Sequence, residues 1–504
     1  MAKLTWQGVH AFAISYIGYL SLYLVRKPVS VSIPYIKQEF SICSKLVLSI
    51  IPNCHLLPYS FTAILLPNLV DRFGGRKSST ITFGGAGISI ACIFLTRFLP
   101  QENKIPSLAF VCFCIFCGGF FQAFGWPSAM KSLAENIPPK LRDAVLPIWT
   151  TCCFVGSSVG GILLGAILMT QKNSFREDGF CENVWNGTEC GKNQFFEKTI
   201  SNCEIPNILK FQNINGTEVR HMNWGLAYVF PAMAPILMAF VTFFTMPEPV
   251  DTSENVDAEH DNFKGRDPES RLTPESPKIS IFQIVAEIPG VLWLALAYAC
   301  AKGSRYWFFY WCIDWLVEES NGAFSPAVAT YLSTALDIGT ILGLLLVGPL
   351  TTENWFTKTI LRKPVPSLYC AALSISSAIP MIYFARLAVQ TNDVYIVFGV
   401  LIILGALVAL SDPIYSGTAA CEASDIDGRN LHGSVSGFIN GTGSFGALLL
   451  NPIASYLGDL DYKYALVTVS VTLAMGTVLT FCAHRSLERA KKKRIQFNSR
   501  WGSN

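Results

Sequence analysis

Cationic side chains stand inside two long apolar segments of this sequence, where a charge is costly. Arg26 and Lys27 lie within YLVRKPVS, and Lys302 and Arg305 lie within AKGSRYWFFYWCIDWL. An arginine at the centre of a spanning helix costs about 2.5 to 3.5 kcal/mol on insertion-based scales, so such residues mark functional sites. Clustered cations of this kind are suited to binding an anion.

Tyrosines share the helical faces of these cations. One face of the first segment carries Tyr16, Tyr19, Tyr23 and Arg26, spaced three, four and three residues apart. One face of the second carries Lys302, Arg305, Tyr306 and Phe309, with Trp307 and Trp311 beside it. The alternative is that both clusters are interfacial cations that snorkel to the membrane surface. Against it, apolar residues resume at 29–36 after the first cluster, and the second apolar stretch begins near Ile281.

Phosphate is the predicted ligand of Arg26 and Arg305, because planar guanidinium groups bind phosphate oxygens in pairs. We expect no carboxylate on the same faces to neutralise both clusters. Asp314 and Asp337 lie too far along their helices to do so, although Asp337 could pair with one cluster. Tyrosine and tryptophan side chains suit a small organic body attached to the phosphate. Lys131 is a further candidate cation, for which a structural role at a helix end is equally open.

The elements that must position these residues are membrane helices. Of the 504 residues, 51% are hydrophobic and 14% are charged. A spanning helix needs about 20 mainly apolar residues. The first set of such segments is 8–36, 46–70, 78–98, 107–131, 144–170 and 224–246; the second is 283–316, 326–350, 365–388, 394–420, 432–457 and 464–483. The sequence therefore predicts an all-α membrane protein with twelve transmembrane helices in two pseudo-symmetric six-helix bundles.

A polar break divides the chain into two halves. Residues 247–282 are rich in Asp, Glu, Ser and Pro without an apolar period, which indicates a disordered cytoplasmic linker. It separates an N-terminal bundle (1–246) from a C-terminal bundle (283–483), which a basic cytoplasmic tail (484–504) follows. GWPSAM followed by WTTCCFVGSSVGG in the first half echoes SDPIYS followed by FINGTGSFGALL in the second. We expect each proline to break its helix and the glycines to allow close helix contact, as in duplicated transporter halves.

The distribution of basic residues predicts that both termini are cytoplasmic. Residues 171–223 then form a lumenal loop, in which Asn186 and Asn215 stand in glycosylation sequences. The similar sequence at Asn440 lies in an apolar helix and is expected to stay bare. An oxidising lumen would permit one disulfide among three cysteines of the loop, with the pairing open. These are Cys181, Cys190 and Cys203.

Several function classes are excluded by what the sequence lacks. It has no P-loop, no GxSxG or HExxH motif and no zinc-type cysteine pairs, so we expect no enzyme, no cofactor and no metal. A net charge of +3 without a basic soluble domain argues against nucleic-acid binding. Without a P-loop, gradients or exchange must drive any transport.

The chain resembles the organophosphate:phosphate antiporters of the major facilitator superfamily. YLVRKP with IPYI, and FQAFGWPSAMK, look like helices one and four of the bacterial glycerol-3-phosphate transporter. Other segments look like the eukaryotic sugar-phosphate exchangers, which include the glucose-6-phosphate transporters. They are Ala301-Lys302, DIGTILG from Asp337, NWGLAYVFP from Asn223, and HGSVSGFINGTGSFGALL from His432. The resemblance covers both halves.

The resemblance implies an alternating-access exchanger in which Arg26 and Arg305 grip the phosphate group of a phosphorylated sugar or of inorganic phosphate. An empty site with unneutralised cations would be costly to reorient, whereas an occupied site is charge-compensated, which favours exchange. The sequence departs from the bacterial pattern at Ala63, which replaces a lysine, and at Cys153, which replaces a histidine. Lys302 would supply the missing charge, as in the eukaryotic exchangers. Which sugar is carried stays open.

The segment DRFGGRK, between the second and third predicted helices, contains Asp71, Arg72 and Arg76. It resembles the charged loop of the same superfamily, which implies ion pairs that lock the inner faces of neighbouring helices. The alternative is an ordinary cytoplasmic turn.

Two further functions remain open at this point. One is transport of another organic anion, such as a carboxylate or a nucleotide, and the other is a receptor on the same fold that moves no solute. The expected partners are the lipid bilayer and a small-molecule substrate; the oligomeric state is open. The resemblance favours the endoplasmic reticulum membrane, with the plasma or endolysosomal membrane as alternatives.

Overall fold

The computed structural model describes residues 5–39, 42, 44–99, 104–137, 139–170, 226–247, 281–351, 363, 365–427 and 432–501. The glycosylation sequences at Asn186 and Asn215, the three loop cysteines and nearly all of the linker lie outside these residues, and they stay predictions.

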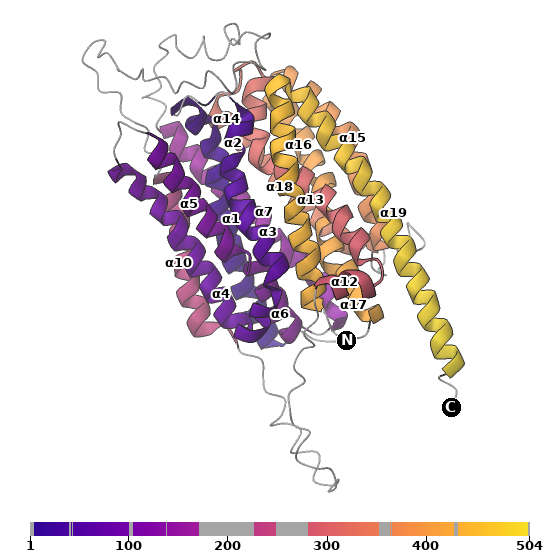
Figure 1. Cartoon of the computed structure of the whole chain (residues 1–504). Helices are drawn as coiled ribbons and strands as arrows, with labels where there is room; N and C mark the ends of the chain where they lie inside the picture. Colours follow the sequence, from indigo (N-terminus) through magenta and orange to yellow (C-terminus); the bar gives the residue numbers. More distant parts are fainter. Residues whose placement is uncertain are drawn as a thin grey trace, which may run out of the picture.

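In the first half of the chain, the long segments that the structure describes are helices. Its helices are α1 (Trp6–Glu39), α2 (Lys45–Leu48), α3 (Ile50–Leu65), α4 (Pro67–Ala91) with a 3-10 extension (Cys92–Phe98), α5 (Lys104–Gln122), α6 (Gly125–Asn136), α7 (Pro139–Thr170) and α10 (Leu226–Thr245). Those of the second half are α12 (Ile281–Glu287), α13 (Val291–Glu319), α14 (Pro326–Thr351), α15 (Ser367–Gln390), α16 (Val394–Ala409), η5 (Ile414–Thr418), α17 (Ala419–Asp427), α18 (His432–Leu460) and α19 (Tyr462–Trp501). Figure 1 shows the two halves side by side.

Each of the twelve predicted segments lies on a described helix or helix pair. Ten helical passages among the described residues are long and apolar enough to cross a membrane. The two that fall short of this measure are α13, which carries Lys302 and Arg305, and α18, which is rich in Gly, Ser and Asn. These two helices pack along one another. Their polar residues are therefore sheltered from lipid by the rest of the bundle.

The packing of the helices repeats between the halves. In the first half α1 packs on α7, α3 on α5, and α4 on α10; in the second, α13 packs on α18, α14 on α16, and α15 on α19. Across the middle, α7 packs on α14 and α18 packs on α3. The predicted pseudo-symmetry of the two halves is confirmed by these matched contacts.

Both predicted helix breaks are present. The fourth passage is interrupted between α5 and α6, just before GWPSAM, and the tenth changes to the π-helical turn η5 directly after Pro413. Gln122 ends α5, and Asp412 precedes Pro413. Each break thus has a polar side chain beside it, and the two breaks lie in corresponding helices of the two halves.

Glycines allow the backbones of the paired helices to touch. A Cβ placed on Gly156 of α7 would lie 2.2 Å from the carbonyl oxygen of Leu20 in α1. A Cβ on Gly446 of α18 would lie 2.4 Å from the carbonyl oxygen of Ala299 in α13. The close helix contact predicted from the two glycine-rich segments is confirmed, and it brings both cation-bearing helices, α1 and α13, against their partners.

Candidate functional site

Arg26 is buried at the centre of the bundle with an exposed fraction of 3%. Its Nε donates to Gln122 Oε1 at 2.5 Å, and its Nη1 donates to the hydroxyl of Tyr306 at 3.1 Å. The guanidinium carbon lies 4.5 Å from the ring centre of Tyr23 and 5.2 Å from that of Tyr59. Its Nη2 is buried without a hydrogen-bond partner. Aromatic faces thus stabilise the cation, and one donor is left for a further acceptor.

Arg305 approaches the same tyrosine from the other half. Its guanidinium carbon lies 4.9 Å from the ring centre of Tyr306 and 5.4 Å from that of Phe154. Its Nε lies 2.8 Å from Oδ2 of Asp412, which is 4% exposed. The expectation concerned carboxylates on the same helical faces, and it did not foresee this partner from another helix. Asp412 lies at the break after α16. The helical periodicity of α13 does not show which residues of other helices lie beside Arg305, so this partner could not be predicted from it.

Lys27 also has an anionic partner. Its Nζ lies 3.2 Å from Oδ2 of Asp337, and the same oxygen accepts a hydrogen bond from Ser157 at 2.7 Å. The three residues come from α1, α14 and α7, so the ion pair connects the two halves. The prediction that Asp337 could pair with one cluster is confirmed.

Lys302 is held by Asn440 of α18. Its Nζ donates to Oδ1 of Asn440 at 2.7 Å and to the carbonyl oxygen of the same residue at 3.1 Å. It also lies 5.6 Å from the ring centre of Tyr59 and 5.3 Å from that of Tyr298. Asn440 is 3% exposed, which gives its side chain a structural task inside the bundle.

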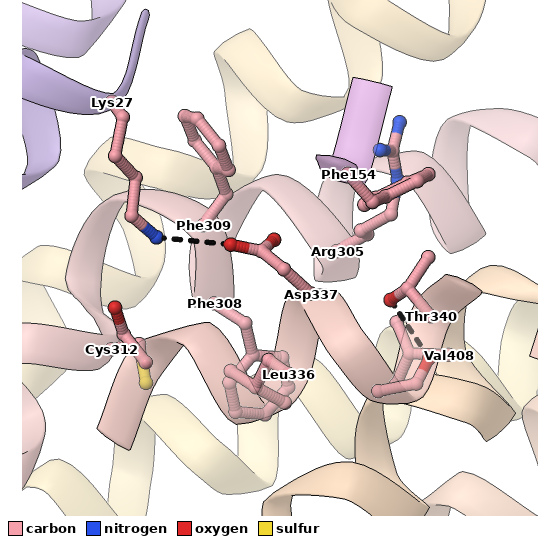
Figure 2. A pocket seen from close by; sticks show the side chains of 12 residues that line it. Lys27, Phe154, Arg305, Phe308, Phe309, Cys312, Leu336, Asp337, Thr340 and Val408 are labelled. Atoms are coloured by element: carbon pink, nitrogen blue, oxygen red, sulfur yellow. Dashed lines mark hydrogen bonds and ion pairs between the residues drawn. The ribbon is translucent and has the colours of Figure 1, made fainter. Parts of the chain in front are cut away.

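A cavity of about 40 Å³ lies beside these residues (Figure 2). Lys27, Asp337 and Arg305 line it together with Phe154, Phe309 and Thr340. Pockets for small organic ligands usually measure about 300 to 1,000 Å³, and this volume suffices for only a few water molecules. Arg26 and Lys302 do not line this cavity. The arrangement is therefore closed to a larger ligand, which can reach all four cations only when helices of the two halves move apart.

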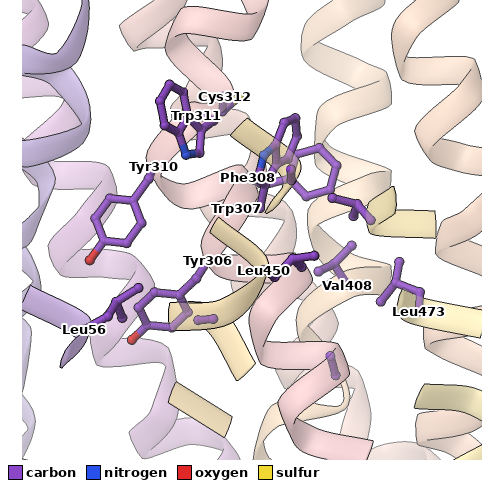
Figure 3. Close-up of a cluster of buried hydrophobic side chains, with 14 of the residues drawn as sticks. Leu56, Tyr306, Trp307, Phe308, Tyr310, Trp311, Cys312, Val408, Leu450 and Leu473 are labelled. Atoms are coloured by element: carbon purple, nitrogen blue, oxygen red, sulfur yellow. The ribbon is translucent and has the colours of Figure 1, made fainter. Parts of the chain in front are cut away.

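The aromatic residues near the cations differ in role. Figure 3 shows Tyr306 and Tyr310 on one side of α13 and Trp307 and Phe308 on the other. Trp307 packs against Phe308 and against Tyr462 of α19, and Trp311 is 1% exposed in the same apolar core. The expectation that tryptophans line the site is wrong for these two residues. Their period along the helix directs them away from the cations.

The remaining predicted residues lie around this centre with different outcomes. Tyr19 packs on Trp149 at a ring distance of 5.1 Å, next to Tyr23. Lys131 lies in α6 and does not line the cavity.

In the segment DRFGGRK, Gly74 has a positive φ of 77° and kinks α4. Arg76 donates to the carbonyl oxygen of Phe243 in α10 at 2.6 Å, a contact within the first half. The side chains of Asp71 and Arg72 lie outside the described atoms, and the locking role of this segment stays a prediction.

Sequence reasoning missed four polar residues of the site. They are Tyr59, Gln122, Asp412 and Asn440, each from a helix other than the one that carries its cation. Asp412 and Gln122 stand next to the repeated proline breaks, which was the available signal. The sequence did not show which cation each would meet.

A second group of charges joins the halves at the end where α1 and α13 terminate. We call it the end cluster: Lys37, Lys45, Asp314, Glu318 and Asp459. Nζ of Lys45 lies 2.9 Å from Glu318, and the backbone N–H of Lys45 donates to Asp459 at 2.6 Å. Lys37 pairs with Glu318 and lies 3.8 Å from Asp314. Burial lowers the pKa of Lys37, but the nearby charges of Asp314 and Glu318 outweigh it and raise that pKa above its usual value. Lys37 is thus cationic throughout the physiological range.

Breaking the end cluster is expected to open the bundle from that end. In Glu318→Gln, Lys37 and Lys45 lose their shared partner, which favours separation of α1 from α13. Ser30→Cys reports it, because Ser30 Oγ contacts the carbonyl oxygen of Tyr310 at 3.2 Å between these helices. We expect the labelling of this cysteine by a thiol reagent, measured by mass spectrometry, to rise about 5- to 30-fold. This is the effect of a change of about 1 to 2 kcal/mol in the free-energy difference between the closed and the open arrangement. Glu488→Gln, in the extension of α19, is the matched control. Equal labelling in both variants would show that the end cluster does not hold the closed state.

Comparison with known proteins shows which folds this chain resembles. Residues 15–176 match the family described as Major Facilitator Superfamily. The chain aligns over 95% of its length with FucP, a transporter of that superfamily in the outward conformation, with a TM-score of 0.57 and 13% identity; 99% of FucP is covered. A bacterial homologue of the lysosomal transporter Spinster, inward-facing and occupied, gives a TM-score of 0.53 at 17% identity, covering 96% of this chain and 97% of that one.

Curated relatives cover most of the chain at low identity. Sugar phosphate exchanger 3 of Mus musculus is 24% identical over 478 residues, which are 89% of this chain and 86% of that protein. Glucose-6-phosphate exchanger SLC37A2 of Xenopus tropicalis is 23% identical over 412 residues, or 75% and 69% of the two chains. A glycerol-3-phosphate transporter of Bacillus subtilis is 27% identical over 166 residues, which are 32% of this chain and 35% of that one.

Proposed function

We infer that this chain, a multi-pass membrane protein that matches the Major Facilitator Superfamily over residues 15–176 and resembles its transporters in fold, exchanges a phosphorylated sugar for inorganic phosphate. Arg26 and Arg305 bind the phosphate group, with Lys27 and Lys302 adding positive charge. The observation that carries this proposal is the buried Nη2 of Arg26, a charged donor without a protein partner beside Tyr306, which both arginines contact.

The charge of the site suits a phosphate. Four cations, of which three are buried and Arg305 is 11% exposed at its side chain, face two carboxylates, Asp337 and Asp412; this leaves two net positive charges when all six groups are ionised. The cations are Arg26, Lys27, Lys302 and Arg305. A phosphate monoester carries about −1.5 to −2 at pH 7 and so neutralises this excess almost fully. A monocarboxylate would leave one charge buried and uncompensated, which is costly in a bilayer.

The sugar would be recognised by the tyrosines of the site. Tyr23, Tyr59 and Tyr306 present hydroxyl groups and ring faces close to Arg26. Such surfaces suit the hydroxyl and apolar faces of a hexose. The names of the relatives, sugar phosphate exchanger and glucose-6-phosphate exchanger, support the same class of substrate.

Transport would proceed by alternating access, with the closed arrangement described above as one state of the cycle. We further propose that both termini are cytoplasmic, that Asn186 and Asn215 are glycosylated in the lumen, and that the protein resides in the endoplasmic reticulum. The basic tail and the sequence of the 171–223 loop support this orientation.

Exchange in proteoliposomes tests the proposed function. Purified protein is reconstituted with phosphate inside, and uptake of labelled phosphate is measured with and without external glucose 6-phosphate. We expect uptake that depends on internal phosphate and is inhibited by the sugar phosphate. Uptake of a carboxylate or nucleotide that is indifferent to phosphate would indicate a carrier of another organic anion. Phosphate binding without any counterflow would indicate a receptor.

A further inference from the structure

We propose that Asp412 is a built-in counter-anion that occupies Arg305 when phosphate is absent, and that it thereby sets how much net transport accompanies exchange. The inference rests on the proposed phosphate exchange and extends it to the empty carrier. It begins from the ion pair between Arg305 Nε and Asp412 Oδ2, 2.8 Å apart and largely buried.

The two arginines are compensated differently. Arg26 of α1 meets the neutral amide of Gln122 at the break of the fourth passage. Arg305 of α13, its counterpart in the second half, meets the carboxylate of Asp412 at the break of the tenth passage. At corresponding helix breaks of the two halves, one arginine thus meets an amide and the other a carboxylate. Only the second-half arginine therefore has its charge neutralised by its partner at the break.

The contact between Arg305 and Asp412 is suited to exchange of partners. The Nε–H of Arg305 does not form an aligned hydrogen bond despite the short distance, and Oδ1 of Asp412 is buried without a partner. Arg305 lines the cavity, whereas Asp412 does not. A phosphate entering the cavity therefore meets the guanidinium of Arg305 and not the carboxylate of Asp412. Arg305 can then turn from carboxylate to phosphate by rotation of its side chain.

The consequence concerns the return of the empty carrier. With Asp412 ionised, the empty site holds two net positive charges; with a neutral residue there it would hold three. Reorientation moves these charges through a low-dielectric barrier, and each uncompensated buried charge makes it harder. Asp412 therefore permits a limited empty return, and hence net transport. Without it, the carrier becomes a stricter exchanger that holds phosphate more tightly.

The test compares two fluxes in the same proteoliposomes loaded with labelled phosphate. Exchange is efflux into medium with phosphate, and net transport is efflux into phosphate-free medium. We expect Asp412→Asn to lower the ratio of net transport to exchange by about tenfold or more, the effect of one uncompensated buried charge. Asp412→Glu keeps the anion and is expected to retain the ratio of the unsubstituted protein. An unchanged ratio in Asp412→Asn would overturn the proposal.

Phosphate binding provides a second measurement that does not require transport. In detergent, thermal stabilisation by inorganic phosphate gives an apparent Kd for each variant. We expect about tenfold tighter binding in Asp412→Asn, because phosphate no longer competes with the carboxylate. Weaker or equal binding would contradict the proposal even if this variant were inactive. Absence of phosphate exchange in the unsubstituted protein would instead refute the proposed function.

Discussion

Replacement of Arg26 by lysine is expected to lower phosphate exchange by about ten- to a hundredfold. A lysine keeps the positive charge but loses the planar fork that holds Gln122 and Tyr306 while Nη2 stays available. Charge-assisted hydrogen bonds contribute about 1.5 to 3 kcal/mol each, and the loss of one in a site without water approaches this factor. Exchange of labelled phosphate in proteoliposomes, normalised to the reconstituted protein, measures the effect.

The control for this variant is Arg489→Lys, at an exposed position in the extension of α19. It makes the same chemical change outside the bundle, and we expect the exchange rate of this variant to stay within about twofold of that of the unsubstituted protein. Exchange by Arg26→Lys within a few-fold of Arg489→Lys would show that a point charge suffices at this position. The assignment of the Arg26 guanidinium, with its available Nη2, as the phosphate ligand would then be wrong.

Replacement of Gly405 by valine is expected to prevent assembly of the second half. A Cβ at Gly405 of α16 would lie 2.1 Å from the carbonyl oxygen of Leu336 in α14, and neither backbone can yield without separating the helices. Overpacking of this kind costs about 3 kcal/mol or more. Because Leu336 immediately precedes Asp337, separation of α14 would also displace the partner of Lys27. The fraction of monodisperse protein and its Tm in detergent measure the effect.

The same helix offers a matched control for this variant. A Cβ at Gly399 meets no atom within 4 Å, so Gly399→Val makes the identical change on an open face of α16. We expect its Tm to stay within about 2 °C of the original. Similar losses in both variants would point to the helical propensity of valine, and the close approach of α14 and α16 would not be the cause.

The positions of the spanning helices could be predicted from the sequence, because a helix that crosses a membrane needs about 20 mainly apolar residues in a row. Such a stretch is a local property of the sequence. The two proline breaks and the glycine contacts were likewise predictable, since they depend on the backbone of the residues themselves. By hydropathy alone α13 and α18 would have been missed. The sequence nevertheless indicated both, because each is a long, mainly apolar stretch between polar breaks.

The cations of the site were predicted for a related reason. A buried arginine or lysine is costly wherever the helix packs, so Arg26, Lys27, Lys302 and Arg305 indicated a site without any knowledge of their neighbours. Their tyrosines on the same face, Tyr23 and Tyr306, followed from helical periodicity. Periodicity did not show which faces meet, and Trp307, which shares the helix with Arg305, proved to belong to the core.

What only the tertiary structure decided is how these charges are compensated. Asp412 reaches Arg305, Gln122 reaches Arg26, Asn440 holds Lys302, and Glu318 meets Lys45 across the two halves. Each pair joins helices that are distant in the chain, so it depends on packing angles and on the exact rotation of each helix. By itself, the sequence determined that cations are buried at matched positions in two halves. Packing determined that one arginine carries its own counter-anion and the other keeps a free donor.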